Sequence, residues 1–210
     1  MQSLALGFLR ITLIVEFGWI LLGHYRFNSP WSELLYPTLV SVGFTVIAVA
    51  PRKARWIAAP LRIFIGLAFV GAVCDRLGLF GKPGTPGVSW GDFKNFVAYT
   101  AQVNSFLPAA VIRGLAVIES FIEGGLGAAM ILGVGVRKVS AASATLLCCF
   151  GLAMTISLGF DSQFPFAVFV LTAGAAVLAT LDSSSWWSVD ALFLRLRRGS
   201  TSETPTALPR

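Results

Sequence analysis

Six ionisable residues lie inside stretches of sequence that are otherwise apolar: Arg10, Glu16, Arg62, Arg113, Glu119 and Glu123. Glu119 and Glu123 are four residues apart, so on a helix they share one face, about 40° apart around the axis. An ionisable side chain inside a membrane normally faces the interior of a helical bundle and has a partner there. These residues could therefore line a polar pocket for a quinone, a proton or a small substrate, or they could form a network that only fixes helix packing.

Depth along the expected helices suggests partners for some of these charges. Counting about 1.5 Å per residue places Arg62 and Glu123 at similar depths, so we predict an ion pair between them. Arg113 lies nearer the outer side of its helix, where Asp75 is its candidate partner. Both pairs would join the third and fourth apolar stretches of the chain.

Glu119 lies near the middle of its expected helix and has no basic residue at its own depth. It therefore either carries a proton or meets Glu16, water or a ligand. The candidate polar pocket consists of four residues: Arg62, Arg113, Glu119 and Glu123. Secondary candidates are the other two intramembrane charges and two neighbouring residues at the outer end of a span: Arg10, Glu16, Asp75 and Cys74. No catalytic role follows for any of them from the sequence.

The cysteines and the single histidine limit the redox chemistry of the chain. Cys74 stands alone, Cys148 and Cys149 are adjacent, and no C-x-x-C pair exists. Neighbouring residues on a helix point about 100° apart, so the adjacent pair is better suited to packing than to bridging. His24 cannot by itself ligate a bis-histidine haem or a His-rich metal site. We predict no cofactor bound by this chain alone apart from a quinone, and any haem, flavin or iron–sulfur centre would belong to a partner.

Composition identifies the solvent that these charges face. The chain is 56% hydrophobic and only 12% charged, with a mean hydropathy of +0.78. Soluble domains carry about 25% charged residues, so an integral membrane protein is indicated. About 20 apolar residues span a bilayer as a helix. Six stretches approach that length: Leu4 to Gly23, Leu34 to Ala50, Ile57 to Asp75, Pro108 to Gly133, Val139 to Gly159 and Phe166 to Leu181.

The positions of the basic residues predict the orientation. Every second connection between spans is basic: Arg52, Lys53 and Arg55, then Arg137 and Lys138, then Arg195, Arg197 and Arg198. By the positive-inside rule both termini are cytoplasmic. The net charge of +6 is then mostly a topology signal. The lipid bilayer is the expected partner, and nucleic acid is not.

Two segments outside the spans have an organisation of their own. Ser89 as N-cap, with Asp92 three residues later, predicts a short helix at the outer surface, either a lid packed over the bundle or an element for docking or substrate access. Trp186 to Arg198 predicts an amphipathic helix on the cytoplasmic leaflet. From Gly199 onward the composition is typical of a disordered tail.

Three segments together resemble the DoxX family of small bacterial membrane proteins. They are "LRIFIGLAFVGAVCDRLGLFG" with Arg62, the "WGDF" segment, and the acidic, glycine-rich "ESFIEGGLGAAMILGVGVRK" with Glu123 and Arg137. The resemblance covers about Ile57 to Leu181. It implies a four-helix bundle in a bacterial cytoplasmic (inner) membrane, related to the membrane subunit of thiosulfate:quinone oxidoreductase. The hairpin Leu4 to Ala50 departs from that four-span pattern.

The expected fold is an all-α polytopic membrane protein: a four-helix DoxX-like bundle with an added N-terminal hairpin, six spans in total. Residues 1–52 form the hairpin, residues 53–182 the core with an outer loop at 76–107, and residues 183–210 the amphipathic helix and tail.

The function that this reading favours is an integral membrane subunit of a redox system, in contact with a quinone through the polar pocket. As an enzyme it would be at most a quinone-linked oxidoreductase subunit without its own metal or haem, working with a soluble or membrane redox partner. A small-molecule or proton carrier or channel uses the same charges, and an assembly scaffold needs them only for packing. The sequence does not name the substrate, the electron donor or the oligomeric state.

Overall fold

The computed structural model describes residues 1–51, 55–181 and 188–191, and its regular elements are all helices within these ranges. Five helices are long: α1 (Gln2–Phe27), α2 (Trp31–Val49), α3 (Arg55–Arg76), α5 (Ala109–Leu132) and α6 (Val136–Leu158). Three elements are shorter: α4 (Phe93–Val103), the 3-10 helix η1 (Phe160–Phe166) and α7 (Val168–Thr180). The long helices begin and end within a few residues of the spans expected from hydropathy.

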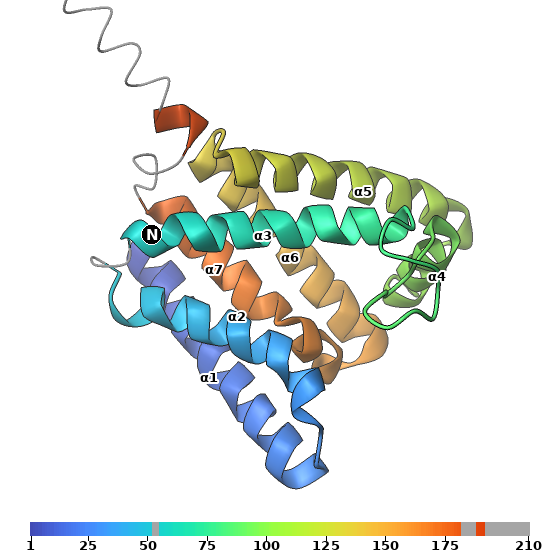
Figure 1. Ribbon diagram of the computed structural model, residues 1–210, viewed down its shortest axis with the longest axis horizontal. Coiled ribbons are helices and arrows are strands. Elements are labelled where there is room, and N and C mark those ends of the chain that lie inside the picture. The colour runs from blue at the N-terminus through green and yellow to red at the C-terminus, as the bar shows by residue number, and fades with distance from the viewer. Residues whose placement is uncertain (52–54, 182–187, 192–210) are drawn as a thin grey trace, which may run out of the picture.

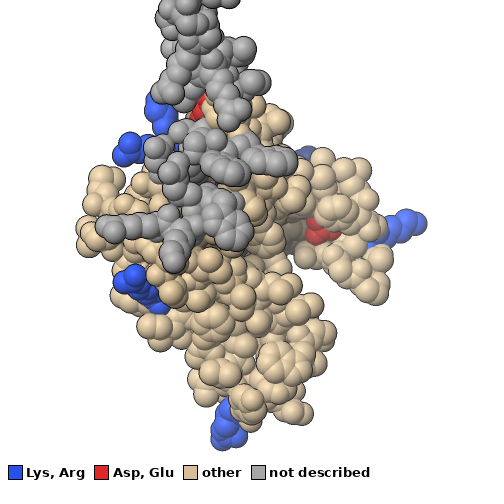
Figure 2. Space-filling model, turned by 60° about the vertical axis from the view of Figure 1, so that its left-hand side comes forward, with Lys and Arg blue, Asp and Glu red and all other residues tan. Residues whose placement is uncertain are grey.

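The described residues contain five helices that are long and apolar enough to cross a membrane, or six if one bent pair counts as a span. In that pair η1 meets α7 at 64°. The sixth expected span is therefore a 13-residue helix preceded by a bend, instead of a straight helix. Large apolar side chains are exposed along the spans, among them Phe121 at 79% and Ile14 at 72%. The chain is an integral membrane protein, and Figure 2 shows a face of uncharged side chains with Lys and Arg at its edges.

The helices associate as two groups, α1, α2, α6 and α7 in one and α3, α4 and α5 in the other, and contacts of both α6 and α7 join them. α1 packs against α2 and α7, and α6 runs along α7, while α3 runs along α5 (Figure 1). α7 is buried along most of its length and lies in the main hydrophobic core. Gly174 permits its close approach to α2, because a Cβ there would lie 2.2 Å from the Phe44 ring.

The α1–α2 hairpin has a defined antiparallel register. Leu34 lies against Gly23 near the connection, with its Cδ2 3.5 Å from the position of a Gly23 Cβ. At the other end the Arg10 guanidinium donates two hydrogen bonds to the Ala48 carbonyl, at 3.1 and 3.0 Å. This cation satisfies a carbonyl of the last turn of α2, which has no partner within the helix.

The α3–α5 pair is held at short range by two glycines. A Cβ on Gly66 would lie 2.8 Å from the Gly127 carbonyl oxygen, and a Cβ on Gly127 would lie 2.9 Å from the Gly66 oxygen. Small residues let membrane helices approach closely in this way. The register that results places the end of α3, at Arg76, beside the middle of α5. The rest of α5 extends beyond α3, and α4 covers that part (Figure 1).

α4 begins later than the sequence pattern predicts. Asp92 is the N-cap, and its Oδ1 accepts a hydrogen bond from the Asn95 amide at 2.7 Å. The predicted N-cap, Ser89, lies outside the helix. Gly91, between Ser89 and Asp92, has a left-handed φ of 70°, which an α-helix does not adopt. The predicted helix Trp186 to Arg198 lies outside the described residues, apart from Ser188–Ala191.

Candidate functional site

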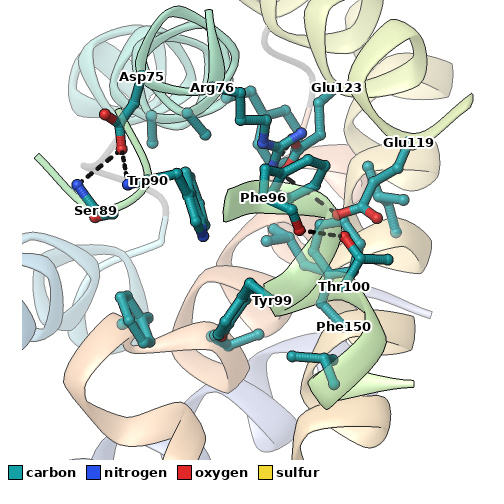
Figure 3. A pocket seen from close by; sticks show the side chains of 18 of the residues that line it. Asp75, Arg76, Ser89, Trp90, Phe96, Tyr99, Thr100, Glu119, Glu123 and Phe150 are labelled. Carbon is teal, nitrogen blue, oxygen red and sulfur yellow. Dashed lines mark hydrogen bonds and ion pairs between the residues drawn. The ribbon is translucent and has the colours of Figure 1, made fainter. Parts of the chain in front are cut away.

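A cavity of about 520 Å³ lies where α3, α4, α5, α6 and the start of α7 meet (Figure 3). Its walls are mainly aliphatic and aromatic. Four acidic or basic side chains line it within the described part of the chain: Asp75, Arg76, Glu119 and Glu123. A largely apolar hollow with a few convergent polar groups is the usual form of a small-molecule site.

Arg76 is at the centre of the polar groups and is only 3% exposed. Its Nη2 lies 2.5 Å from Glu123 Oε2 and 3.9 Å from Glu119 Oε1. Its Nη1 donates a hydrogen bond to the Ser120 hydroxyl at 3.2 Å. One guanidinium from the end of α3 is thus surrounded by three polar side chains of α5.

Aromatic rings enclose the same guanidinium from the α4 side. The Arg76 Cζ lies 3.6 Å from the centre of the Phe96 ring and 5.1 Å from that of Trp90. A desolvated cation over an aromatic face is worth about 2 kcal/mol or more. Trp90 also lies edge-on to Phe96 at 5.2 Å and near Tyr99 at 5.8 Å. The rings and the cation together fix α4 over the cavity.

Asp75 anchors the loop that precedes α4. Its carboxylate accepts hydrogen bonds from the backbone amides of Ser89, Trp90 and Gly91, at 2.9, 3.0 and 3.3 Å. The predicted pair between Asp75 and Arg113 is therefore wrong. Arg113 is exposed on α5 and has no hydrogen bond or ion pair with any described residue.

Arg62 also lies away from its predicted partner. It is buried, and it donates hydrogen bonds to the backbone carbonyls of Met130 and Ile131, the second at 3.5 Å. Its charge also interacts with Asp190. The predicted Arg62–Glu123 pair is wrong because α3 is shifted along α5 by about two helical turns relative to equal depth. Arg62 binds backbone carbonyls at the end of α5, next to the α5–α6 turn, and Arg76 instead lies beside Glu123.

The secondary candidates are dispersed. Arg10 is bound to Ala48, and Glu16 is a buried residue of α1 whose Oε1 has no hydrogen-bond partner in the described part of the chain. Neither lines the cavity. Cys74 is half-buried outside the cavity wall, whereas Cys149 is exposed and lines it. Of the four predicted pocket residues, only Glu119 and Glu123 line the cavity, together with the secondary candidate Asp75.

Tyr99 adds a hydrogen-bond donor to the cavity. Burial raises the pKa of its hydroxyl, and the nearby Glu119 carboxylate raises it further. The hydroxyl therefore keeps its proton at neutral pH and can donate a hydrogen bond. It forms none with the described residues, so its donor remains available to a ligand.

Sequence reasoning missed the central cation and its aromatic partners. Arg76 directly follows the apolar run of α3, and a basic residue at that point is also what a membrane interface favours. One feature of the sequence could have indicated Arg76. Two acids on one face of a membrane helix need a cation close by, and Arg76 is the basic residue nearest the predicted outer end of the preceding span. Trp90 and Phe96 lie in the segment after Ser89, for which the sequence predicts only a short helix at the outer surface.

The charge balance of the cluster determines what it can do. Two carboxylates share a single guanidinium, so Glu123, in direct contact, is the counterion of Arg76. Glu119, at 3.9 Å and 13% exposed, is the acid that faces the cavity more openly. An acid in that position can hold a proton or accept a hydrogen bond from a ligand.

Comparisons with protein-family models, with curated proteins and with solved structures find no match to this chain. No group of three or more histidine, cysteine, aspartate or glutamate side chains suited to a metal ion occurs among the described residues. The resemblance to the DoxX family therefore stays a prediction.

Proposed function

We propose that the chain is the integral membrane subunit of a redox system and holds a quinone head group in the cavity beside Arg76. The observation that carries this proposal is the position of a buried Arg76–Glu119–Glu123 cluster in the wall of an otherwise apolar cavity inside a membrane protein. Membership of the DoxX family, proposed from the residues that resemble it, is consistent with this function.

The cavity residues fit such a ligand in size and in chemistry. A volume of about 520 Å³ lies within the range of about 300 to 1,000 Å³ typical of small-molecule sites. Trp90 and Tyr99 offer aromatic surfaces to a planar ring. The Tyr99 hydroxyl and the Arg76 guanidinium are donors, and a quinone carbonyl is an acceptor.

Each side chain then has a distinct task. Glu123 holds Arg76 in place, and Arg76 together with Tyr99 would orient the head group. Glu119 is the candidate for exchanging a proton with the cavity. A quinone supplies two-electron, two-proton redox chemistry when bound, and the electrons would come from a partner protein that carries its own redox centre.

Quenching of Trp90 fluorescence tests the proposal. A tail-less dimethoxy-dimethyl-benzoquinone, whose fully substituted ring has no free position for addition of a thiol, should quench the protein in lipid nanodiscs with a saturable component, because Trp90 lines the cavity. Trp90→Phe should remove that component and leave the collisional quenching of the other five tryptophans. Identical quenching curves for the two proteins would overturn the proposal.

The proposed location is a bacterial cytoplasmic membrane, with both termini and the α5–α6 turn on the cytoplasmic side. The basic residues Arg137 and Lys138 follow that turn and support this orientation. Reporter fusions after Lys138 should read cytoplasmic, and fusions near Gly84 should read outside. A cytoplasmic readout at Gly84 would reverse the orientation.

A further inference from the structure

The cavity reaches the surface of the protein between α5 and α6. Ile118 and Ile122 of α5 line the cavity and are also 58% and 45% exposed. Cys149, on the facing part of α6, likewise lines the cavity and is exposed. We call this the α5–α6 opening and define it by the residues that border it: Leu115, Ile118, Ile122, Leu146, Cys149 and Phe150.

This opening differs from the other exposed part of the cavity wall. Phe80 and Gly87 belong to the loop before α4, Phe166 ends η1, and Tyr36 lies in the second turn of α2, so that part lies at or near the ends of helices. Ile118, Ile122 and Cys149 instead lie near the middle of helices that can cross the membrane. Only 22% of the residues in the apolar stretch of α5 are buried, the lowest share among the five candidate spans. The α5–α6 opening therefore faces the hydrocarbon of the bilayer.

Beside the opening, the acidic and the apolar side chains of α5 lie on different sides of the helix. Ile118 and Ile122 directly precede Glu119 and Glu123, and successive residues on a helix point about 100° apart. The two acids therefore lie on the Arg76 side of the helix while the two isoleucines border the opening. Among the described residues no charged side chain borders the opening, which suits an aliphatic chain and not a polar solute.

We infer that the α5–α6 opening is the passage through which the prenyl tail of a quinone leaves the cavity and enters the bilayer. The ligand reaches the site sideways from the membrane, with its head group toward Arg76 and Tyr99. This inference rests on the proposed function, because it concerns the tail of the ligand that the cavity would hold. It adds a requirement of its own, that ligands with long tails occupy the space beside Cys149.

The two adjacent cysteines of α6 provide a matched test. Cys149 lines the cavity, and its neighbour Cys148, half-buried, does not. Two single-cysteine proteins, C74A/C148A and C74A/C149A, would be treated with a membrane-permeant maleimide in nanodiscs. A long-tailed ubiquinone at about ten times its Kd should slow alkylation of Cys149 about tenfold and leave that of Cys148 unchanged. The tail-less quinone should protect Cys149 much less.

The outcomes separate this inference from the proposed function. If the tail-less quinone quenches Trp90 while the long-tailed quinone leaves Cys149 alkylation unchanged, the passage lies elsewhere and the head-group site stands. Equal protection of Cys148 and Cys149 would also overturn the inference, because it would show shielding by quinone dissolved in the lipid. Absence of the Trp90 component with either quinone would overturn both proposals.

Ile118→Trp gives an independent check on the passage. The larger ring should obstruct the opening and weaken binding of the long-tailed quinone relative to the tail-less one. Phe121→Trp is the control, because Phe121 lies on the same helix, is 79% exposed and does not line the cavity. Binding is read by displacement of a radiolabelled quinone, which the added tryptophan does not disturb. Equal affinities for the long-tailed quinone in both variants would contradict the inference.

Discussion

A buried acid has a counterion in one half of the molecule and no described counterion in the other. Where α1 meets α2 and α7, Glu16 is 1% exposed, and its Oε1 has no hydrogen-bond partner among the described residues. Where α3 meets α5, Glu123 is similarly buried but lies 2.5 Å from Arg76. The first half is packed tightly at Gly174 and Phe44, and the second encloses a cavity.

This difference shows that burial of a charge is not itself the signature of a site. An acid without a counterion is costly to keep ionised in a low-dielectric interior, so it is suited to a neutral role in packing. An acid with a cation, a hydroxyl and two aromatic rings around that cation is held by several elements at once. The second arrangement leaves room for a ligand, which is why we place the function there.

The largest effect should come from removing the cation of the second region. Arg76→Met leaves two buried carboxylates without a counterion, and breaking such a pair costs about 3 to 5 kcal/mol. Folded yield in mild detergent should fall sharply. Arg113→Met is the control, since Arg113 is an exposed arginine and has no partner among the described residues. Equal yields for the two variants would show that the Arg76 cluster contributes no stability.

A somewhat smaller loss is expected where α3 and α5 approach each other. Gly66→Ala puts a Cβ 2.8 Å from the Gly127 carbonyl oxygen, and forcing extra volume into a packed contact costs about 1 to 3 kcal/mol. Gly125→Ala on the same α5 helix puts a Cβ where no atom of the described residues lies within 4 Å, and it should be tolerated. Thermal unfolding of both variants measures the difference. A stable Gly66→Ala protein would mean that the α3–α5 register is looser than described.

The two acids of the cluster should respond differently to the same change. Glu123→Gln weakens the 2.5 Å ion pair and should cost about 1 to 3 kcal/mol, because the Arg76 charge loses its nearest partner. Glu119→Gln should leave stability nearly intact and lower turnover with a redox partner, since an amide cannot exchange a proton. Thermal unfolding and quinone reduction at equal folded protein separate the two effects. Unchanged turnover in Glu119→Gln would remove this acid from the mechanism.

The smallest effect should appear in the first region. Glu16→Gln replaces an acid that has no described counterion with a neutral side chain of the same shape. Its effect on stability should stay within about 0.5 kcal/mol, and quinone binding should not change. A large loss of stability, measured by thermal unfolding, would show that Glu16 is ionised and paired, and the contrast between the two regions would disappear.

Hydropathy predicted the long helices well because each one must satisfy its backbone within an apolar stretch of fixed length. It did not predict the bend before α7, where a short helix is surrounded by protein and needs no full span. The tail and the basic segment at 52–54 lie outside the described residues, so the predictions made for them stay predictions.

The site was predicted only in part, for a physical reason. Spacing placed Glu119 and Glu123 on one face, and the structure confirms that they lie together beside Arg76. Which cation meets them depends on the shift of α3 along α5, and that shift is set by Gly66 against Gly127. Counting residues from the ends of the apolar stretches gives equal depths only if both helices begin at the same level in the membrane. On that assumption Arg62, and not Arg76, lies at the depth of Glu123.

Photoaffinity labelling with a short-chain azidoquinone tests most directly the claim that the second region is the binding region. The protein in nanodiscs would be illuminated at saturating probe, digested, and the labelled peptides identified by mass spectrometry. We expect labels at residues that line the cavity, such as Trp90 in the loop before α4, Tyr99 in α4 and Cys149 in α6, and competition by unlabelled quinone. Saturable labelling concentrated in α1, around Glu16, with none at the cavity would contradict the account.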